Sequence, residues 1–207
     1  MSTAPKSTAP KSTAPKSTAP ESTAPVSTAP WPVRATTDSV EATRELAGRL
    51  APLCRAGDVV LLVGDLGAGK TAFAQGFAAA LGVEGPVTSP TFALVRHYRC
   101  GAASAVSALI HADVYRTGSL AEVVDLALAE LVEEDAVALV EWGDLAAPAL
   151  GESTLEVRLE LVHGGDGDDG AGAAGVPTGR RVAVVGHGAW AARSGEVAAA
   201  LEPVGAA

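Results

Sequence analysis

The segment GDLGAGKT, residues 64–71, has the residue types and the spacing of a phosphate-binding loop. It matches the pattern G-x-x-x-x-G-K-[ST] at every fixed position. Glycines in such a loop let backbone N–H groups converge on an anion, and the helix that begins there directs its positive end at the same point. The lysine neutralises the β- and γ-phosphates of ATP, and the next hydroxyl binds Mg²⁺. We predict that the nucleotide contacts Gly64, Asp65, Leu66, Gly67, Ala68, Gly69, Lys70, Thr71 and Ala72.

Two acidic residues are candidates for the carboxylate that such a magnesium site needs at the end of a neighbouring strand. Glu141 ends the apolar run AVALV, and we predict that it binds Mg²⁺ together with Thr71; the alternative is a solvated strand end. Asp113, in the strand-like segment HADVYR, is predicted to contact the metal indirectly or to orient the attacking water. His111 is interpreted as a packed, hydrogen-bonded residue rather than a proton shuttle.

A short loop after the predicted P-loop helix carries two hydroxyl groups, on Ser89 and Thr91. NTPases often place a segment that senses the γ-phosphate at this point of the chain. Hydroxyls in such a loop reach water, metal or phosphate, so we predict that both residues contribute to the nucleotide site. The alternative is an ordinary Ser-Pro turn.

Strand and helix patterns around these residues provide the frame of a P-loop protein. DVVLLVG, residues 58–64, is a continuous apolar run, as expected for a strand buried on both faces. After the glycines, Phe73, Phe77 and Leu81 recur every four residues, and Gly82 closes this helix. Further helices are predicted over residues 39–53, 119–135 and 194–201, and further strands over 91–99 and 107–116, which form a hairpin, and over 136–140, 153–162 and 180–186.

This order of elements predicts an α/β fold: a P-loop NTPase with a mostly parallel central sheet flanked by helices, and an antiparallel hairpin at its edge. We expect a single ATPase domain over residues 34–207. Residues 1–33 are predicted to be a disordered tail, because six STAP repeats place a proline at every fifth residue and offer little apolar surface. Residues 164–179 are predicted to be an acidic, glycine-rich loop, since Pro177 stands where a calcium-binding EF-hand loop requires glutamate.

Composition narrows the class of function. The 207 residues carry a formal net charge of −9 and contain no cluster of Lys and Arg, so stable direct binding of nucleic acid is not expected. Cys54 and Cys100 have no CxxC spacing, which disfavours a zinc site or a disulfide framework. No stretch is apolar enough to span a membrane, and the N-terminus lacks the apolar segment of a signal peptide. We expect a soluble, cytoplasmic protein with no membrane contact.

Four segments, in their order along the chain, resemble the TsaE (YjeE) family of P-loop ATPases, which acts in tRNA threonylcarbamoyladenosine (t6A) biosynthesis. The resemblance covers about residues 38–162 and rests on GDLGAGKTAFAQGFAAALGV, VTSPTFALVRHY, HADVYR and AVALVEW. It implies that Glu141 and Asp113 are the family's magnesium-binding and catalytic carboxylates, acting with Lys70. It also places an arginine near the nucleotide just before the last strand, which is Arg180 here. Three positions depart from the family pattern: Ala72, Thr117 and Ala127 stand where a threonine, a leucine and a glycine are usual.

The resemblance implies an ATPase subunit that supports t6A modification of tRNA, with ATP and Mg²⁺ as cofactors and homologues of TsaD and TsaB as partners. Chemistry on the tRNA would belong to TsaD, which agrees with the acidic net charge. Hydrolysis would be slow alone and stimulated by the partners. Two alternatives stay open: a P-loop small-molecule kinase, for which no arginine-rich lid is found before Glu141, and a nucleotide-gated binding module without useful turnover.

Overall fold

The computed structural model describes residues 31–90, 94–115, 117, 120–132, 135–163 and 177–202. The strands in this part of the chain are β1 (Val33–Thr37), β2 (Val59–Val63), β3 (Val95–Arg99), β4 (Ala108–Asp113), β5 (Ala136–Glu141), β6 (Thr154–His163) and β7 (Pro177–Gly186). The α-helices are α1 (Val40–Leu50), α2 (Lys70–Ala80), α3 (Leu120–Asp125), α4 (Leu128–Val132), α5 (Gly143–Ala146) and α6 (Ser194–Leu201). Short 3₁₀ turns cover Ala51–Leu53, Ala147–Ala149 and Gly188–Arg193.

The described strands form one seven-stranded sheet in the order β1-β7-β6-β2-β5-β4-β3. Its four central strands, β6, β2, β5 and β4, are parallel, whereas β3 pairs antiparallel with β4, and β7 pairs antiparallel with both β6 and β1. The predicted α/β fold with a parallel centre and an edge hairpin is therefore confirmed. Because parallel strands end at the same edge of a sheet, the loop after β2 and the last residues of β4 and β5 meet there.

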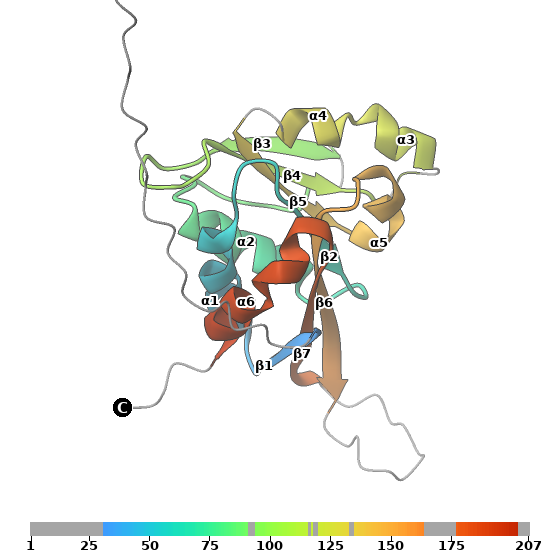
Figure 1. Ribbon diagram of the computed structural model, residues 1–207. Coiled ribbons are helices and arrows are strands. Elements are labelled where there is room, and N and C mark those ends of the chain that lie inside the picture. Colours follow the sequence, from blue (N-terminus) through green and yellow to red (C-terminus); the bar gives the residue numbers. More distant parts are fainter. Residues whose placement is uncertain are drawn as a thin grey trace, which may run out of the picture.

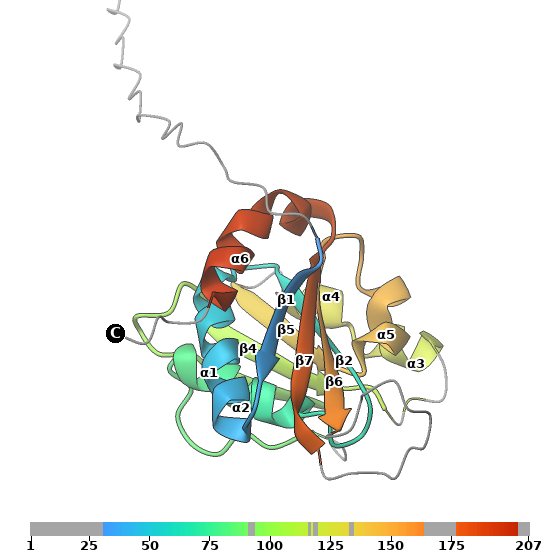
Figure 2. The same cartoon turned by 90° about the horizontal axis from the view of Figure 1, so that it is seen from below.

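One face of the sheet packs against α1, α2 and α6, which lie on the same side in Figures 1 and 2. Helix α2 contributes Phe73 and Phe77, whose ring centroids are 6.2 Å apart, and both rings are completely buried. Residues of β2, β6 and β7 complete this core, together with Trp190 from the turn before α6. Burial of so much apolar surface fixes α2, and therefore the loop that precedes it, against the sheet.

The other face packs against α3, α4 and α5, which cover β2, β5 and β4. The sequence predicts one continuous helix over residues 119–135, but the structure divides its described part into α3 and α4. The interruption is at Ala127, whose backbone is left-handed with a φ of +49°. A left-handed residue cannot continue a right-handed helix, so this face is covered by short helices.

The boundaries of the folded part also differ from the prediction. Strand β1 was not predicted, and its first residue, Val33, lies inside the predicted tail, where it pairs with Val184 of β7. Strand β7 begins at Pro177, inside the predicted acidic loop 164–179. β1 gains its hydrogen bonds by pairing with β7, and the first residues of β7 pair with the end of β6, which a local pattern does not reveal. Residues 1–30 and 164–176, on which the remaining tail and loop predictions fall, lie outside the described residues.

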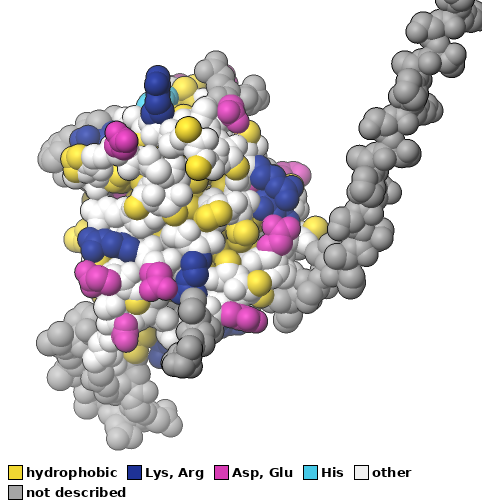
Figure 3. Space-filling view, turned by 90° about the vertical axis from the view of Figure 1, so that its left-hand side faces the viewer, with side chains coloured by type: hydrophobic (Ala, Val, Ile, Leu, Met, Phe, Trp, Pro, Cys, Tyr) yellow, Lys and Arg dark blue, Asp and Glu magenta, His cyan; other side chains and the backbone are white. Residues whose placement is uncertain are grey.

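The surface shows no single-sign charged region on the side displayed in Figure 3, where Lys and Arg side chains lie next to Asp and Glu side chains. On α1, the charged atoms of Arg44 and Glu41 are 3.2 Å apart. No helix in the described part of the chain is long and apolar enough to cross a membrane. Cys54 and Cys100 are both buried free thiols.

Candidate nucleotide-binding site

The loop between β2 and α2 has a backbone that requires glycine. Gly69 caps the N-terminus of α2 with a φ of +109°, and a Cβ atom there would lie 2.8 Å from Nε of Arg180. Gly64, with a φ of +145°, passes so close to β6 that a Cβ atom would lie 2.2 Å from the carbonyl oxygen of Leu159. Glycine adopts a positive φ without steric cost, and only a residue without a Cβ atom fits such close approaches. The free N–H groups that begin α2 therefore face the space enclosed by this loop.

Lys70, the first residue of α2, folds back onto this loop. Its Nζ donates hydrogen bonds to the carbonyl oxygens of Gly64, at 2.6 Å, and Asp65, at 3.0 Å. The ammonium group also lies 3.8 Å from the ring centroid of Trp142, a cation–π contact. Burial lowers the pKa of Lys70 from its ordinary value, while the carboxylates of Glu141 and, to a smaller extent, Asp113 act in the opposite direction. A cation is thus held in the loop, partly desolvated and close to two acids.

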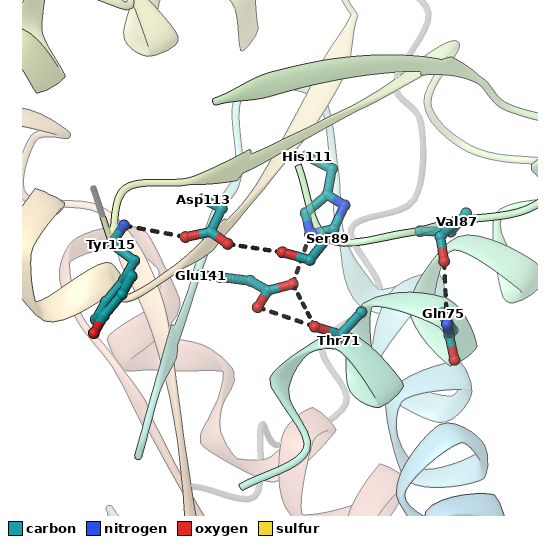
Figure 4. A network of polar contacts seen from close by, with 8 residues as sticks. All are labelled: Thr71, Gln75, Val87, Ser89, His111, Asp113, Tyr115 and Glu141. Atoms are coloured by element: carbon teal, nitrogen blue, oxygen red, sulfur yellow. Dashed lines mark hydrogen bonds and ion pairs between the residues drawn. The ribbon is translucent and has the colours of Figure 1, made fainter. Parts of the chain in front are cut away.

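Thr71 and Glu141 face each other across the sheet edge, as Figure 4 shows. The Thr71 hydroxyl lies 3.1 and 3.2 Å from the two carboxylate oxygens of Glu141, the last residue of β5. On the opposite side of this carboxylate, Nε2 of His111 lies 3.1 Å from Oε1. Both Glu141 and His111 are buried, and the two polar partners compensate for the desolvation of the carboxylate.

Asp113 is held by a second, adjacent set of contacts (Figure 4). The hydroxyl of Ser89 donates to Oδ2 at 2.7 Å, and the backbone N–H of Tyr115 donates to Oδ1 at 3.1 Å. Asp113 also pairs in register with Glu141 on the neighbouring parallel strand. Paired residues of adjacent strands point to the same side of a sheet, so the two carboxylates belong to one site.

The loop that carries Ser89 is fixed to α2 and α1 by a polar chain. Nε2 of Gln75 donates to the carbonyl oxygen of Val87 at 3.1 Å (Figure 4). The side-chain oxygen of Gln75 accepts from Nε and Nη2 of Arg44, at 3.2 and 2.8 Å. The position of Ser89 relative to the P-loop is therefore set by the helix that the P-loop begins.

These groups surround a pocket of about 570 Å³. Arg180 reaches the pocket from β7, and its Nε donates to the carbonyl oxygen of Ala68 at 2.9 Å. The predicted residues that line the pocket are Leu66, Gly67, Gly69, Lys70, Thr71, Ala72, Ser89, Asp113, Glu141 and Arg180. Gly64, Asp65 and Ala68 belong to the same loop but do not line the pocket, and Thr91 lies outside the described residues. A larger hollow, of about 760 Å³, is lined by α1 together with β1, β7 and β6, but no glycine loop lines it.

Sequence reasoning did not assign a role to three residues that the structure brings to this site. Trp142 covers Lys70, Tyr115 stacks on Trp142 with ring centroids 4.6 Å apart, and Val40 contributes to the pocket wall from the start of α1. Trp142 has a left-handed backbone, with a φ of +59°, which aims its ring back over the pocket instead of along the strand. The only feature of the sequence that could have indicated a role for Trp142 is its position directly after Glu141.

A match to a known protein family covers this site except for Arg180. The family description "Threonylcarbamoyl adenosine biosynthesis protein TsaE" matches residues 37–166, which is more than half of the chain. The chain belongs to the TsaE family. The match begins at the end of β1 and includes the P-loop, both carboxylates and β6.

Individual members of the TsaE family are similar over most of their length. The chain is 45% identical over 137 residues to "tRNA threonylcarbamoyladenosine biosynthesis protein TsaE" of Mycobacterium tuberculosis H37Rv, covering 64% of this chain and 81% of that protein. It is 41% identical over 133 residues to the protein of the same name from Bacillus subtilis, covering 64% and 78%. The crystal structure of Bacillus subtilis YdiB superposes with a TM-score of 0.58 at 31% identity, covering 76% of this chain and 87% of YdiB.

The residues at the sheet edge also suit the metal ion that this family of folds uses. Mg²⁺ prefers hard oxygen ligands and is commonly held by one hydroxyl and one or two carboxylates, with phosphate oxygens and water completing its shell. Thr71 and Glu141 provide a hydroxyl and a carboxylate within 3.2 Å of each other, and Asp113 provides a second carboxylate nearby. The donor set therefore fits Mg²⁺.

Proposed function

We propose that this protein is an ATPase subunit of the machinery that makes t6A in tRNA, and that it hydrolyses ATP together with homologues of TsaD and TsaB. The observation that carries the proposal is the joining of Lys70, Thr71, Glu141 and Asp113 around one pocket in a chain of the TsaE family. The relatives' names link them to t6A biosynthesis and supply the biological context. A cytoplasmic location follows from that role.

Each side chain has a distinct task in the proposed reaction. Lys70 exchanges its contacts to Gly64 and Asp65 for the β- and γ-phosphates, whose negative charge raises the pKa of the ammonium group against the effect of burial. The N-terminus of α2 and the loop N–H groups bind the same phosphates. Thr71 and Glu141 would hold Mg²⁺, which, when bound, neutralises charge that develops on the phosphates.

Asp113 is proposed to position the attacking water. Its carboxylate is already oriented by Ser89 and Tyr115, so it is pre-organised before any ligand arrives. Ser89 would respond to the γ-phosphate, because its hydroxyl can donate either to Asp113 or to a phosphate oxygen. Arg180 would add a second positive charge at the mouth of the pocket.

The experiment that tests this proposal is product analysis of Mg·ATP turnover with and without TsaD and TsaB. We expect free phosphate, released faster when both partners are present, and loss of ATP binding by calorimetry in Lys70→Ala and Thr71→Ala. Phosphate transferred to a small acceptor would establish a kinase instead. Tight binding without turnover under any condition would establish a nucleotide-gated binding module, and unchanged ATP affinity in both variants would refute the P-loop assignment.

A further inference from the structure

Gln75 carries the only side-chain amide of this protein, since the sequence contains one Gln and no Asn. It lies on α2, four residues after Thr71, and residues four apart on a helix occupy the same face, one turn from each other. Gln75 therefore stands one turn behind the hydroxyl that is proposed to hold Mg²⁺. It does not line the pocket, and the reaction proposed above gives it no task.

The two ends of the Gln75 amide are used in opposite ways. The amide oxygen accepts hydrogen bonds from Nε and Nη2 of Arg44 on α1, at 3.2 and 2.8 Å, and the amide nitrogen donates to the carbonyl oxygen of Val87 at 3.1 Å. A rotated amide would set its N–H groups against the guanidinium group and its oxygen against the carbonyl oxygen. Arg44, which also donates to Glu41 at 3.2 Å, therefore fixes the orientation in which the N–H donor faces Val87.

Val87 anchors the loop that carries Ser89. The Val87 side chain is buried in the core beside α2, and its carbonyl oxygen is bound by Gln75. One residue, the exposed Thr88, separates Val87 from Ser89, whose hydroxyl donates to Asp113 at 2.7 Å. Figure 4 shows Val87 next to Gln75 and Ser89 next to Asp113. A movement of Val87 is thus transmitted to Ser89 through a very short piece of backbone.

We propose that Gln75 is a positioning residue for ATP hydrolysis, because its N–H donor to Val87 holds the loop that keeps the Ser89 hydroxyl at Asp113. The inference rests on the proposed function, in which Ser89 responds to the γ-phosphate and Asp113 positions the attacking water. Gln75 acts through the loop backbone, since it does not line the pocket and its contact to the loop is with a carbonyl group. Loss of the donor should loosen the loop and leave the phosphate-binding P-loop intact.

The test compares two substitutions that each keep one half of the amide contacts. Gln75→Glu keeps the acceptor for Arg44 but turns an anionic oxygen toward the carbonyl group of Val87. Gln75→Lys keeps a donor for Val87 but puts a second cation beside Arg44. We expect kcat for Mg·ATP with TsaD and TsaB to fall about tenfold in Gln75→Glu, and less in Gln75→Lys, because a misplacement of about 1 Å can cost roughly a hundredfold. ATP affinity, measured by calorimetry, should change much less than kcat.

A matched control uses the same helix. Ala79→Glu adds a negative charge one turn further along α2, at an exposed position, and should behave like the wild type in turnover and ATP affinity. A loss of turnover in Ala79→Glu equal to that in Gln75→Glu would mean that charge on α2, and not the contact to Val87, causes the effect.

Thermal stability should follow the opposite order from turnover. Gln75→Glu forms an ion pair with Arg44 and should melt no lower than the wild type, whereas Gln75→Lys places like charges together and should melt lower. A residue that only ties α1 to α2 would lose turnover in the order in which it loses stability. Turnover that follows the melting temperature across these variants would therefore reduce Gln75 to a structural tie.

Two further measurements locate the effect in the loop. Hydrogen exchange of the backbone amides of residues 83–89, in the full chain without nucleotide, should be faster in Gln75→Glu than in the wild type or Gln75→Lys. In a Ser89→Ala background, Gln75→Glu should cost little additional turnover, because both changes act on the same hydroxyl. Arg44→Met, which frees the amide to rotate, carries the test if Gln75→Glu is unfolded, and should change turnover and exchange in the same direction by a smaller factor.

The inference is overturned by wild-type turnover in Gln75→Glu, by unchanged exchange in the loop, or by full additivity with Ser89→Ala. Its failure is distinct from failure of the proposed function. Normal turnover of the wild type with a loop that is insensitive to Gln75→Glu refutes the inference alone. Absence of phosphate release by the wild type refutes the proposed function, and the exchange measurement then decides by itself whether Gln75 holds the loop.

Discussion

The two faces of the sheet are covered in different ways. On the face of α1, α2 and α6, long helices bury a stacked Phe73–Phe77 pair and the whole of Trp190. On the face of α3, α4 and α5, the helices have at most six residues, and three large side chains of α3 and α5 stay exposed. The helices on the first face enclose a fully buried core, whereas those on the second leave large apolar side chains exposed to solvent.

Backbone strain follows the same division. The described non-glycine residues with a positive φ are Leu94, directly before β3, and Ala127, Asp135 and Trp142, which lie between β4 and α5. The segments from Val33 to Ala80 and from β6 to α6 contain none among their described residues. Strained backbone persists where other contacts or a function maintain it. Helices α1, α2 and α6 hold the P-loop in place, and α2 itself supplies Lys70 and Thr71 to the pocket, whereas the turn before α5 on the opposite face adds Trp142.

The largest expected effect is on stability. Phe77→Ala should lower the free energy of unfolding by about 3–5 kcal/mol, because it leaves a cavity in the core between the sheet and α1, α2 and α6. Val124→Ser on the opposite face should change it by no more than about 0.5 kcal/mol, since that side chain is mostly exposed. Urea denaturation of both variants measures the contrast, and similar losses would show that the two faces contribute equally.

The next largest effect is expected on ATP turnover, from changes at the edge of the sheet where β4 and β5 end. Glu141→Gln and Asp113→Asn keep the shape of the site but remove the negative charge that positions the metal ion or the water. We expect turnover to fall on the order of a hundredfold, with a smaller loss of ATP affinity and little change in melting temperature. The assay includes TsaD and TsaB, and full turnover in both variants would mean that these carboxylates are structural.

A smaller effect, a gain in stability, is expected from relieving backbone strain at Ala127, on the face covered by α3, α4 and α5. Ala127→Gly should raise the free energy of unfolding by about 1 kcal/mol, because a left-handed alanine costs about 1–2 kcal/mol that glycine does not incur. Ala121→Gly, in the regular part of α3, is the control and should lower it by about 0.5–1 kcal/mol. Destabilisation by both changes would place Ala127 in a right-handed helix.

The smallest effect is expected from removing the tail. Deleting residues 2–30 should leave the melting temperature and ATP affinity nearly unchanged, because STAP repeats offer no apolar surface for a core. Deleting residues 2–37 also removes β1 and its pairing with β7, so that variant should melt several degrees lower. A comparable fall for the shorter deletion would show that the tail is docked.

Most of the fold and the centre of the site were predictable, because they rest on local signals. The buried strand, the glycine loop and the amphipathic helix occur consecutively, and parallel strands that end in Glu141 and Asp113 must converge. Arg180 entered through family resemblance, and the structure places it at the pocket. The roles of its neighbours still await the experiments above.

The unpredicted features depend on contacts between distant segments. β1 is short and gains its hydrogen bonds from β7, almost at the other end of the chain. Trp142 covers Lys70 only because a left-handed turn after β5 redirects it. The break at Ala127 lies in a stretch whose apolar pattern fits one long helix, and the packing that divides it is tertiary.

One contact between α1 and α2 has a mechanical consequence. A Cβ atom at Gly76 would lie 2.1 Å from the carbonyl oxygen of Arg44, so the two helices touch backbone to backbone. The absence of a side chain at residue 76 therefore allows the two helices to pack this closely. Since α1 contacts β1 and α2 begins at Lys70, a methyl group at this position would push the edge of the sheet and the phosphate-binding end of α2 in opposite directions at once. The position of the candidate nucleotide site relative to the sheet therefore depends on residue 76, which does not line the pocket.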